Sequence, residues 1–158
     1  MGMKPRLRYM DYHCDQTLDV FSEILLALKP THVLPEVRQD IRQNHVTCRV
    51  RLRAPTGHRI FLHFLWLRIS ADQQHHDRVK IYDPSPVKTL LTPKSGLYGK
   101  LDRSMDIQDT DGSKITDYRS SQNEIIVEYL GNPTAEHAGF KILLTVFKSK
   151  WKKKLERE

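Results

Sequence analysis

The chain has 158 residues, of which 39% are hydrophobic, and a formal charge of +7. This length accommodates one domain with a sizeable core, and the composition favours a folded chain over a disordered one. The longest aliphatic run, Ile24 to Leu28, is far shorter than the ~20 residues of a membrane-spanning helix. The N-terminus has no apolar segment of the secretory type. We therefore expect either that this sequence is a fragment or incomplete gene product, or that the protein does not use the usual secretory route.

The positive charge is concentrated at the two ends of the chain. Residues 1–11 carry three basic side chains against one acidic, and residues 148–158 carry six against two. The sequence therefore predicts a basic N-terminal segment (1–11), one domain (12–147) and a basic C-terminal tail (148–158). A nucleic-acid-binding domain usually carries its charge on a folded face, so we expect no specific nucleic-acid partner and only weak polyanion binding by the tails.

The first apolar pattern after the N-terminus is helical. Asp15 or Thr17 could cap a helix, and Pro30 would end it. Between them, apolar side chains recur at helical spacing at Leu18, Phe21, Leu25 and Leu28. The segment predicts a short amphipathic helix whose apolar stripe packs against the core.

The patterns after residue 45 are typical of strands. In "CRVRLR", apolar side chains alternate with three arginines, Arg49, Arg51 and Arg53. The next run, residues 58–69, should place one set of side chains on the same face: Ile60, Leu62, Phe64 and Trp66. The turn residues 54–57 between these runs predict a hairpin or neighbouring strands.

Three further strands are expected at residues 77–83, 123–130 and 139–147. Val79 and Ile81 should face inward. Gly96 and Gly99 predict a tight turn around Tyr98, and the polar run 99–118 is interpreted as a long exposed loop. Many short strands between turns indicate an all-β sandwich or barrel.

Three segments in chain order carry a family pattern: "IFLHFLWLRI", "HHDRVKIYDPS…LLTPKSGLYG" and "YRSSQNEIIVEYLGNPTAEHAGFKILL". The matching positions are Phe64, Leu67, Ile69, Asp77, Val79, Ile81, Gly99, Ser120, Asn123, Ile125, Val127, Tyr129, Gly139 and Phe140. This series, covering about residues 46 to 147, resembles the CUB domain, an extracellular β-sandwich module. The resemblance implies an all-β, CUB-like antiparallel sandwich of the jelly-roll type, here preceded by the short helix.

The resemblance also gives the two cysteines a role. Cys14 and Cys48 show no metal-binding spacing, and taken alone they could be two unrelated buried thiols. CUB domains join an N-terminal cysteine to the cysteine that opens the first core strand, which implies a Cys14–Cys48 disulfide. Gln74 and Tyr98 occupy the positions of the family's second disulfide, so we expect the Tyr98 ring to pack where that bridge would lie, near Gln74 or His75.

Many CUB domains bind calcium through three acidic positions, which here are Ser70, Asp77 and Asn132. Only one carboxylate of the three is retained, whereas calcium prefers several oxygen ligands with carboxylates among them. We therefore expect no calcium site and no other cofactor. Asp77 should pair with a backbone N–H or with Arg78.

Two further polar clusters in the sequence are candidate binding sites. His75 and His76 are adjacent and would point to opposite faces of a strand, which disfavours a shared metal. Arg49, Arg51 and Arg53 either bind sulfate, phosphate or acidic groups, or form a solvated face paired with acids on neighbouring strands. With Tyr98, these histidines and arginines are the candidate binding residues.

The sequence has no phosphate-binding glycine loop and no nucleophile motif, so we expect no enzyme. The predicted function is a secreted, extracellular module that binds another protein, extracellular or membrane-bound. Its contacts would come from loops near residues 70–77, 98–100 and 131–138. The alternative is an intracellular β-sandwich that binds anionic polymers or membrane surfaces through basic tails and the arginine-rich strand.

Overall fold

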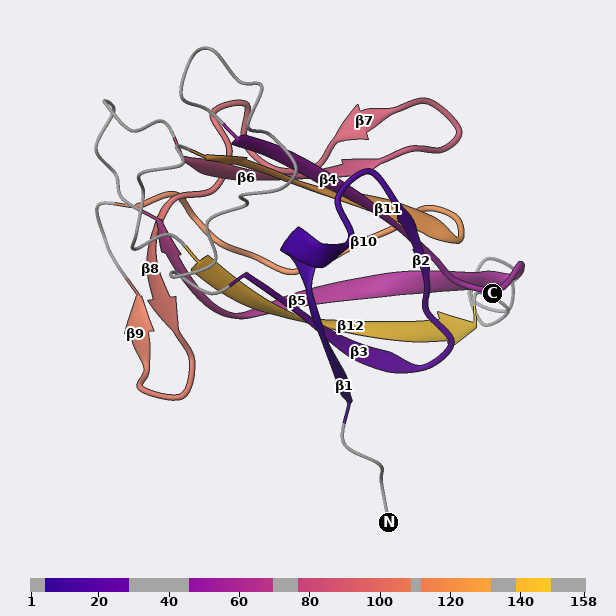
Figure 1. Ribbon diagram of the computed structural model, residues 1–158, viewed down its shortest axis with the longest axis horizontal. Coiled ribbons are helices and arrows are strands. Elements are labelled where there is room, and N and C mark those ends of the chain that lie inside the picture. The colour runs from indigo at the N-terminus through magenta and orange to yellow at the C-terminus, as the bar shows by residue number, and fades with distance from the viewer. Residues whose placement is uncertain (1–4, 29–45, 70–76, 109–111, 132–138, 149–158) are drawn as a thin grey trace, which may run out of the picture.

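Two β-sheets face each other in the structure, a computed structural model that describes residues 5–28, 46–69, 77–108, 112–131 and 139–148 (Figure 1). The seven-stranded sheet has the order β1-β3-β12-β5-β8-β9, with β10 also paired to β5, and the five-stranded sheet has the order β2-β4-β11-β6-β7. The predicted all-β sandwich is confirmed. Its pairs are antiparallel except β1 with β3 and β2 with β4, which are parallel.

The elements in chain order are β1 (Arg6–Tyr9), η1 (Met10–Tyr12), β2 (Thr17–Asp19), β3 (Glu23–Leu28), β4 (Val46–Arg53), β5 (His58–Ile69), β6 (Arg78–Asp83), β7 (Thr89–Leu90), β8 (Gly99–Asp102), β9 (Ile107–Gln108), β10 (Tyr118–Arg119), β11 (Glu124–Gly131) and β12 (Gly139–Lys148). The hydrophobic core lies between the sheets, where alternate side chains of the long strands meet. Its largest fully buried pair, Phe64 and Phe140, packs edge to face with ring centroids 6.5 Å apart.

The helix expected between Asp15 and Pro30 is wrong, because β2 and β3 occupy this segment. In β3, the backbone pairs on both sides, with β1 and with β12. Phe21, which the helical stripe would have buried, is 75% exposed between the two strands. Long-range pairing has therefore outweighed the local periodicity, and the helical residues in the described part of the chain are the three of η1.

The expectation that β4 and β5 form a hairpin or neighbouring strands is also wrong. The two strands lie in different sheets, so the turn after β4 carries the chain across the core. Both strands still direct their apolar faces inward, since Leu52 of one sheet and Ile60 of the other are fully buried in the core between the sheets. The polar run 99–118 is only partly a loop, because it contains β8, β9, the first residue of β10 and a buried side chain, Ile115.

A β-bulge changes the alternation along β5. Lys141 of β12 is opposite Trp66, and the next residue, Ile142, is opposite Phe64, so Leu65 has no partner in this pairing. Beyond the bulge, Leu67 and Ile69 are buried, whereas Trp66 is only half-buried. Trp66 was predicted to share the inward face of Phe64, and the extra residue is the reason that it does not.

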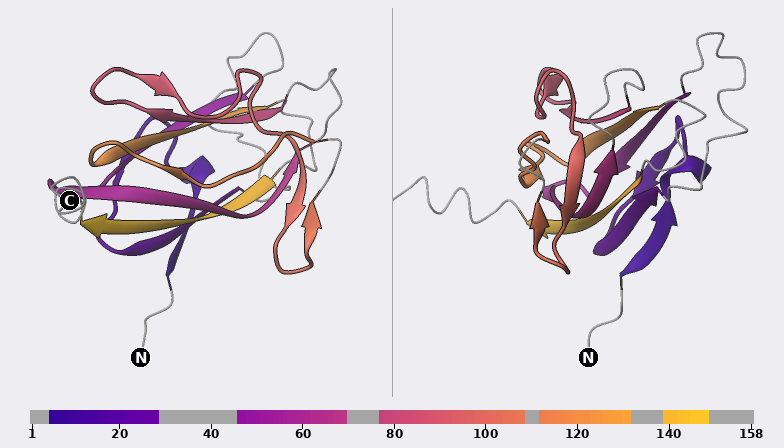
Figure 2. Two further views of the ribbon diagram at one scale, coloured as in Figure 1. Left: turned by 180° about the vertical axis from the view of Figure 1, so that it is seen from behind. Right: turned by 90° about the vertical axis from the view of Figure 1, so that its left-hand side faces the viewer.

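The N-terminal segment connects the two sheets along one side of the sandwich. The chain leaves β1 at the edge of the seven-stranded sheet, passes through η1, and then runs as β2 along the edge of the five-stranded sheet. It returns as β3 to the first sheet, as the views in Figure 2 show. Met10 lies between the sheets and is fully buried. Residues 6–9, which belong to the expected basic segment 1–11, are thus paired within the sandwich.

Candidate functional site

Several long strands end at the same end of the sandwich, at the left of Figure 1. The pairings Phe140 with Leu28, Gly131 with Val46 and Ile69 with Gly99 place these termini side by side. We call this the loop end. Ser70, Gln74, His75, His76 and Asn132 lie outside the described residues, so the expectations that rest on them remain predictions.

Asp77, the one retained carboxylate of the family's calcium positions, is inside the protein. Its side chain is 2% exposed, and the Tyr129 hydroxyl donates a hydrogen bond to Asp77 Oδ2 at 3.2 Å. The Tyr129 ring lies against Gly131, where a Cβ would come within 2.3 Å of the hydroxyl oxygen. Burial, reinforced by the nearby Asp77 carboxylate, raises the pKa of Tyr129 far above its ordinary value.

This raised pKa makes stability depend on alkaline pH. Above about pH 10 the unfolded chain loses the Tyr129 proton while the folded protein keeps it, so the free energy of unfolding falls by about 1.4 kcal/mol per pH unit. Below that pH the contribution is fully present. We expect Tyr129→Phe to cost about 1–3 kcal/mol at pH 7 by removing a donor to a buried carboxylate, and to reduce the alkaline slope. The measurement is urea unfolding between pH 7 and 11.

The control for this experiment is Tyr12→Phe, because the Tyr12 side chain is 66% exposed. This variant should keep both the stability at pH 7 and the alkaline slope. If Tyr129→Phe has the same slope as the wild-type protein, the buried hydroxyl is not the group that titrates.

Tyr98 is half-buried and packs against the core cluster. The Arg78 guanidinium lies over its ring, 4.5 Å from the centroid, a cation–π contact. Ser113 fixes the Tyr98 backbone from both sides: its hydroxyl accepts from the Tyr98 N–H at 2.9 Å, and its own N–H donates to the Tyr98 carbonyl at 3.1 Å. The expected packing of Tyr98 near Gln74 or His75 involves residues outside the described ranges, and Arg78 is the contact that the structure shows.

The turn around Tyr98 has the backbone that its glycines predicted. Gly96 and Gly99 have φ angles of +85° and +107°, which side chains with a Cβ rarely adopt. At Gly99 the backbone also meets Gly112, and a Cβ there would lie 2.8 Å from the Gly112 Cα. Gly99 therefore allows β8 to begin directly beside the loop that carries Ser113.

The three arginines of β4 lie on the outer face of the five-stranded sheet, and each has an acidic partner. Arg49 pairs with Glu128, Arg51 with Glu124 at 2.7 Å, and Arg53 with Asp19 at 3.2 Å. Tyr82 donates to Glu128 at 3.2 Å. Burial and the Glu128 carboxylate raise the pKa of Tyr82. This geometry matches the alternative of a solvated face paired with neighbouring acids.

The outer face of the seven-stranded sheet has a concavity that the sequence patterns did not indicate. Its volume is about 360 Å³, and it is lined by Trp66, Leu67, Arg68, Lys100, Leu101, Asp102 and Ile107. We call it the Trp66 concavity. The unbroken apolar run "FLWL" was the available signal, because three large apolar residues after Phe64 do not fit simple alternation.

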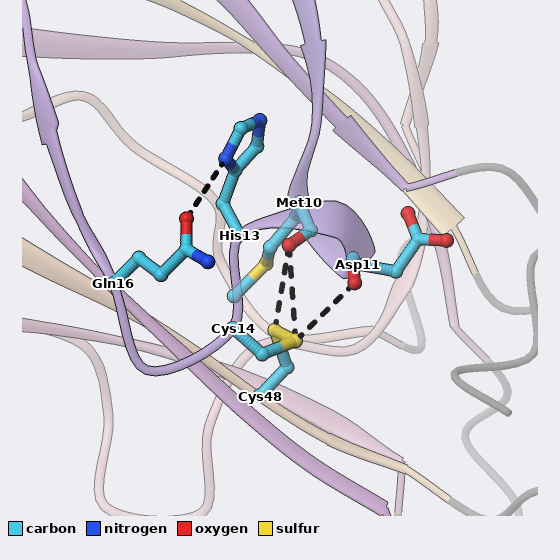
Figure 3. The surroundings of a disulfide bond; sticks show 6 residues. All are labelled: Met10, Asp11, His13, Cys14, Gln16 and Cys48. Atoms are coloured by element: carbon cyan, nitrogen blue, oxygen red, sulfur yellow. Dashed lines mark hydrogen bonds between the residues drawn. A yellow bond between two sulfur atoms is a disulfide. The ribbon is translucent and has the colours of Figure 1, made fainter. Parts of the chain in front are cut away.

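The disulfide joins Cys14 to Cys48, as the resemblance implied, and it is shown in Figure 3. Cys48 is fully buried and Cys14 is half-buried. The Cys48 sulfur lies 3.5 Å from the Met10 carbonyl oxygen. Since a disulfide sulfur has no hydrogen to donate, this is a packing contact. Directly after Cys14 the backbone pairs with β4, where the Asp15 N–H donates to the Arg49 carbonyl at 2.6 Å and the Arg51 N–H donates to the Gln16 carbonyl at 3.0 Å.

In the part of the chain that the structure describes, no cluster of three or more His, Cys, Asp or Glu side chains is placed to hold a metal ion. The same residues include no helix of the length and hydropathy needed to cross a membrane.

These observations define a class of module: a two-sheet β-sandwich in which a disulfide joins the N-terminal segment to a core strand. The family model of the CUB domain matches residues 39–144. The chain belongs to the CUB domain family.

Two solved structures are similar to this chain. The full extracellular region of zebrafish Gpr126/Adgrg6 is 15% identical, with a TM-score of 0.49, over 86% of this chain and 15% of that one. The CUB1-EGF-CUB2 region of human MASP-1/3 is 19% identical, with a TM-score of 0.44, over 70% of this chain and 38% of that one. The chain thus spans well under half the length of either. No curated protein sequence matches it.

Proposed function

We propose that this chain is an extracellular protein-interaction module of the CUB type, without catalytic activity of its own. The observation that carries the proposal is the Cys14–Cys48 disulfide. Disulfides of this structural kind form and persist in oxidising compartments and are rare in the cytosol. With both sulfurs in the bond, neither cysteine can act as a thiolate nucleophile.

The charges of the folded part support a protein partner over a simple polyanion. The three arginines of β4 are already paired with Glu128, Glu124 and Asp19, so binding a sulfate or phosphate there would break existing ion pairs. The loop end, in contrast, combines the half-buried Tyr98 with the Arg78 guanidinium stacked on its ring. We expect the partner to contact this end through side chains, without calcium.

The state of the two thiols in cells tests the compartment. Protein expressed at its natural level is treated with a maleimide-linked polymer before and after reduction. We expect no modification before reduction and two sites after it, in protein recovered from the medium or the cell surface. Two reactive thiols in protein that remains folded would contradict the proposal and favour the intracellular alternative. The Cys14→Ser/Cys48→Ser variant, which should never be modified, is the control.

Binding itself is tested with the full chain, presented as a tetramer to a panel of extracellular receptor domains, with and without a calcium chelator. We expect saturable binding that the chelator does not change. Retention on heparin that disappears when residues 148–158 are deleted, together with no binding to the panel, would favour the polyanion alternative.

A further inference from the structure

The Trp66 concavity exists because the β5 bulge turns Trp66 outward. Two hydrogen bonds from one residue hold the bulge: the Arg103 N–H donates to the Leu65 carbonyl at 3.1 Å, and Arg103 Nε donates to the Phe64 carbonyl at 2.7 Å. These bonds satisfy carbonyl groups at the irregular step in the strand. Bulges commonly re-aim a side chain next to a functional site, and here the re-aimed side chain is a tryptophan.

The β8–β9 hairpin, which projects from one end of the seven-stranded sheet, supplies the opposite wall (Figures 1 and 2). The pairing of Trp66 with Asp102 and of Arg68 with Lys100 places these four side chains on the same outer face. Leu67 and Leu101 alternate with these residues along the strands and are buried in the core, so they line the concavity through their backbone. The exposed Ile107, paired with Asp102, lies on the outer face. The concavity thus combines two apolar side chains, Trp66 and Ile107, with charged ones.

The charge of the concavity is positive and unbalanced. Arg68 and Lys100 are exposed neighbours across the strand pair, and neither forms an ion pair with an acid in the described part of the chain. Lys141 lies opposite Trp66 on β12 and adds a third cation. The acid within the lining, Asp102, accepts hydrogen bonds from Ser104 through its Oδ1 atom, at 2.6 Å from the hydroxyl and 3.0 Å from the N–H. An acidic group would therefore complement this surface.

The same outer face continues as a part-exposed apolar row. Leu7, Leu25 and Leu143 are aligned by pairing across β1, β3 and β12, and Leu7 is 42% exposed. A bare polyanion would gain nothing from such a row, whereas a protein segment with apolar side chains would bury it. Aromatic and arginine side chains are also the residues most enriched at the energetic centres of protein interfaces.

We propose that the Trp66 concavity binds an acidic segment of a partner protein, with a carboxylate on Arg68 and Lys100 and an apolar side chain against Trp66 and Ile107. This inference rests on the proposed function, because an extracellular partner would supply the segment. It adds a site on the sheet face to the contacts expected at the loop end.

The test uses the full chain with Trp151→Phe, which leaves Trp66 as the single tryptophan of the two. The probe is a ten-residue peptide in which glutamate alternates with leucine and phenylalanine, titrated at physiological salt. We expect saturable binding accompanied by a change in Trp66 fluorescence. The charge-reversed peptide, with lysine in place of glutamate, should not bind.

Charge-reversal variants locate the site. Arg68→Glu and Lys100→Glu should each weaken peptide binding at least tenfold, and Arg68→Lys should keep most of it. Lys88→Glu is the matched control, since it changes the net charge equally but lies on the loop before β7, over the Tyr82 ring. An equal loss in Lys88→Glu, or no binding and no fluorescence change, would overturn the inference. The inference would also be overturned if heparin oligosaccharides bound through Arg68 and Lys100 and the peptide did not bind.

The two proposals can fail separately. A receptor domain that binds the chain equally well after Arg68→Glu and Lys100→Glu would reject the Trp66 concavity and leave the interaction module in place. Free thiols in the natural protein would reject the extracellular function, whatever the peptide does.

Discussion

We expect the Cys14→Ser/Cys48→Ser variant to lose about 4 kcal/mol of its free energy of unfolding. The bond closes a loop with a sequence separation of 34, and opening it restores the corresponding conformational freedom to the unfolded chain. The fully buried position of Cys48 adds a second cost, since a serine hydroxyl would replace a sulfur inside the core. The measurement is urea unfolding of wild type and variant under identical conditions.

Reduction separates these two costs. The wild-type protein in excess reductant loses the covalent bond but keeps its sulfur atoms. Reduction alone should therefore lower the free energy of unfolding by most of the ~4 kcal/mol. The double variant should not respond to the reductant. A wild-type protein whose unfolding midpoint is unchanged by full reduction would show that pairing of β2 and β4 holds the N-terminal segment without the bond.

The second large effect is expected at Gly99, where β8 begins. Gly99→Ala places a Cβ on a backbone with φ of +107° and brings it within 2.8 Å of the Gly112 Cα. The left-handed backbone costs about 1–2 kcal/mol and the forced displacement about 1–3 kcal/mol, so we expect a loss of about 3 kcal/mol in urea unfolding.

Gly57→Ala is a matched control for this substitution. Gly57 has a φ of +86°, but a Cβ there would meet no atom within 4 Å. It should lose only the backbone contribution, about 1 kcal/mol. Equal losses in the two variants would mean that the loop carrying Gly112 moves aside without cost, and that the contact with Gly99 does not fix the start of β8.

Alternating strands were predictable from the sequence because burial follows a period of two wherever a strand is regular. Val50, Leu52, Val79 and Ile81 are all fully buried, and Arg51, between the first two, faces outward. The CUB pattern added what periodicity could not provide, namely the pairing of Cys14 with Cys48. The glycine-framed turn at Tyr98 was predictable because positive φ angles strongly favour glycine.

The errors have a common physical origin in contacts between residues distant along the chain. The spacing of Leu18, Phe21 and Leu25 satisfies a helix, and only the available edges of β4 and β12 make strands the better solution. Nor does local sequence indicate that β4 and β5 belong to different sheets. The Trp66 concavity depends on a bulge held by Arg103, which is 38 positions beyond Leu65 in the printed sequence.

The path of the N-terminal segment between the sheets bears on how this family member should be delimited. The family match begins at residue 39, so β1, η1, β2 and β3 all precede it. A fragment cut at that residue would leave Cys48 as a lone thiol facing the core. It would also leave β4 and β12 as long edges with unsatisfied backbone groups, the kind of surface on which chains associate strand to strand. The residues upstream of the match thus cover the edges of β4 and β12, and a fragment that preserves the sandwich should begin before β1.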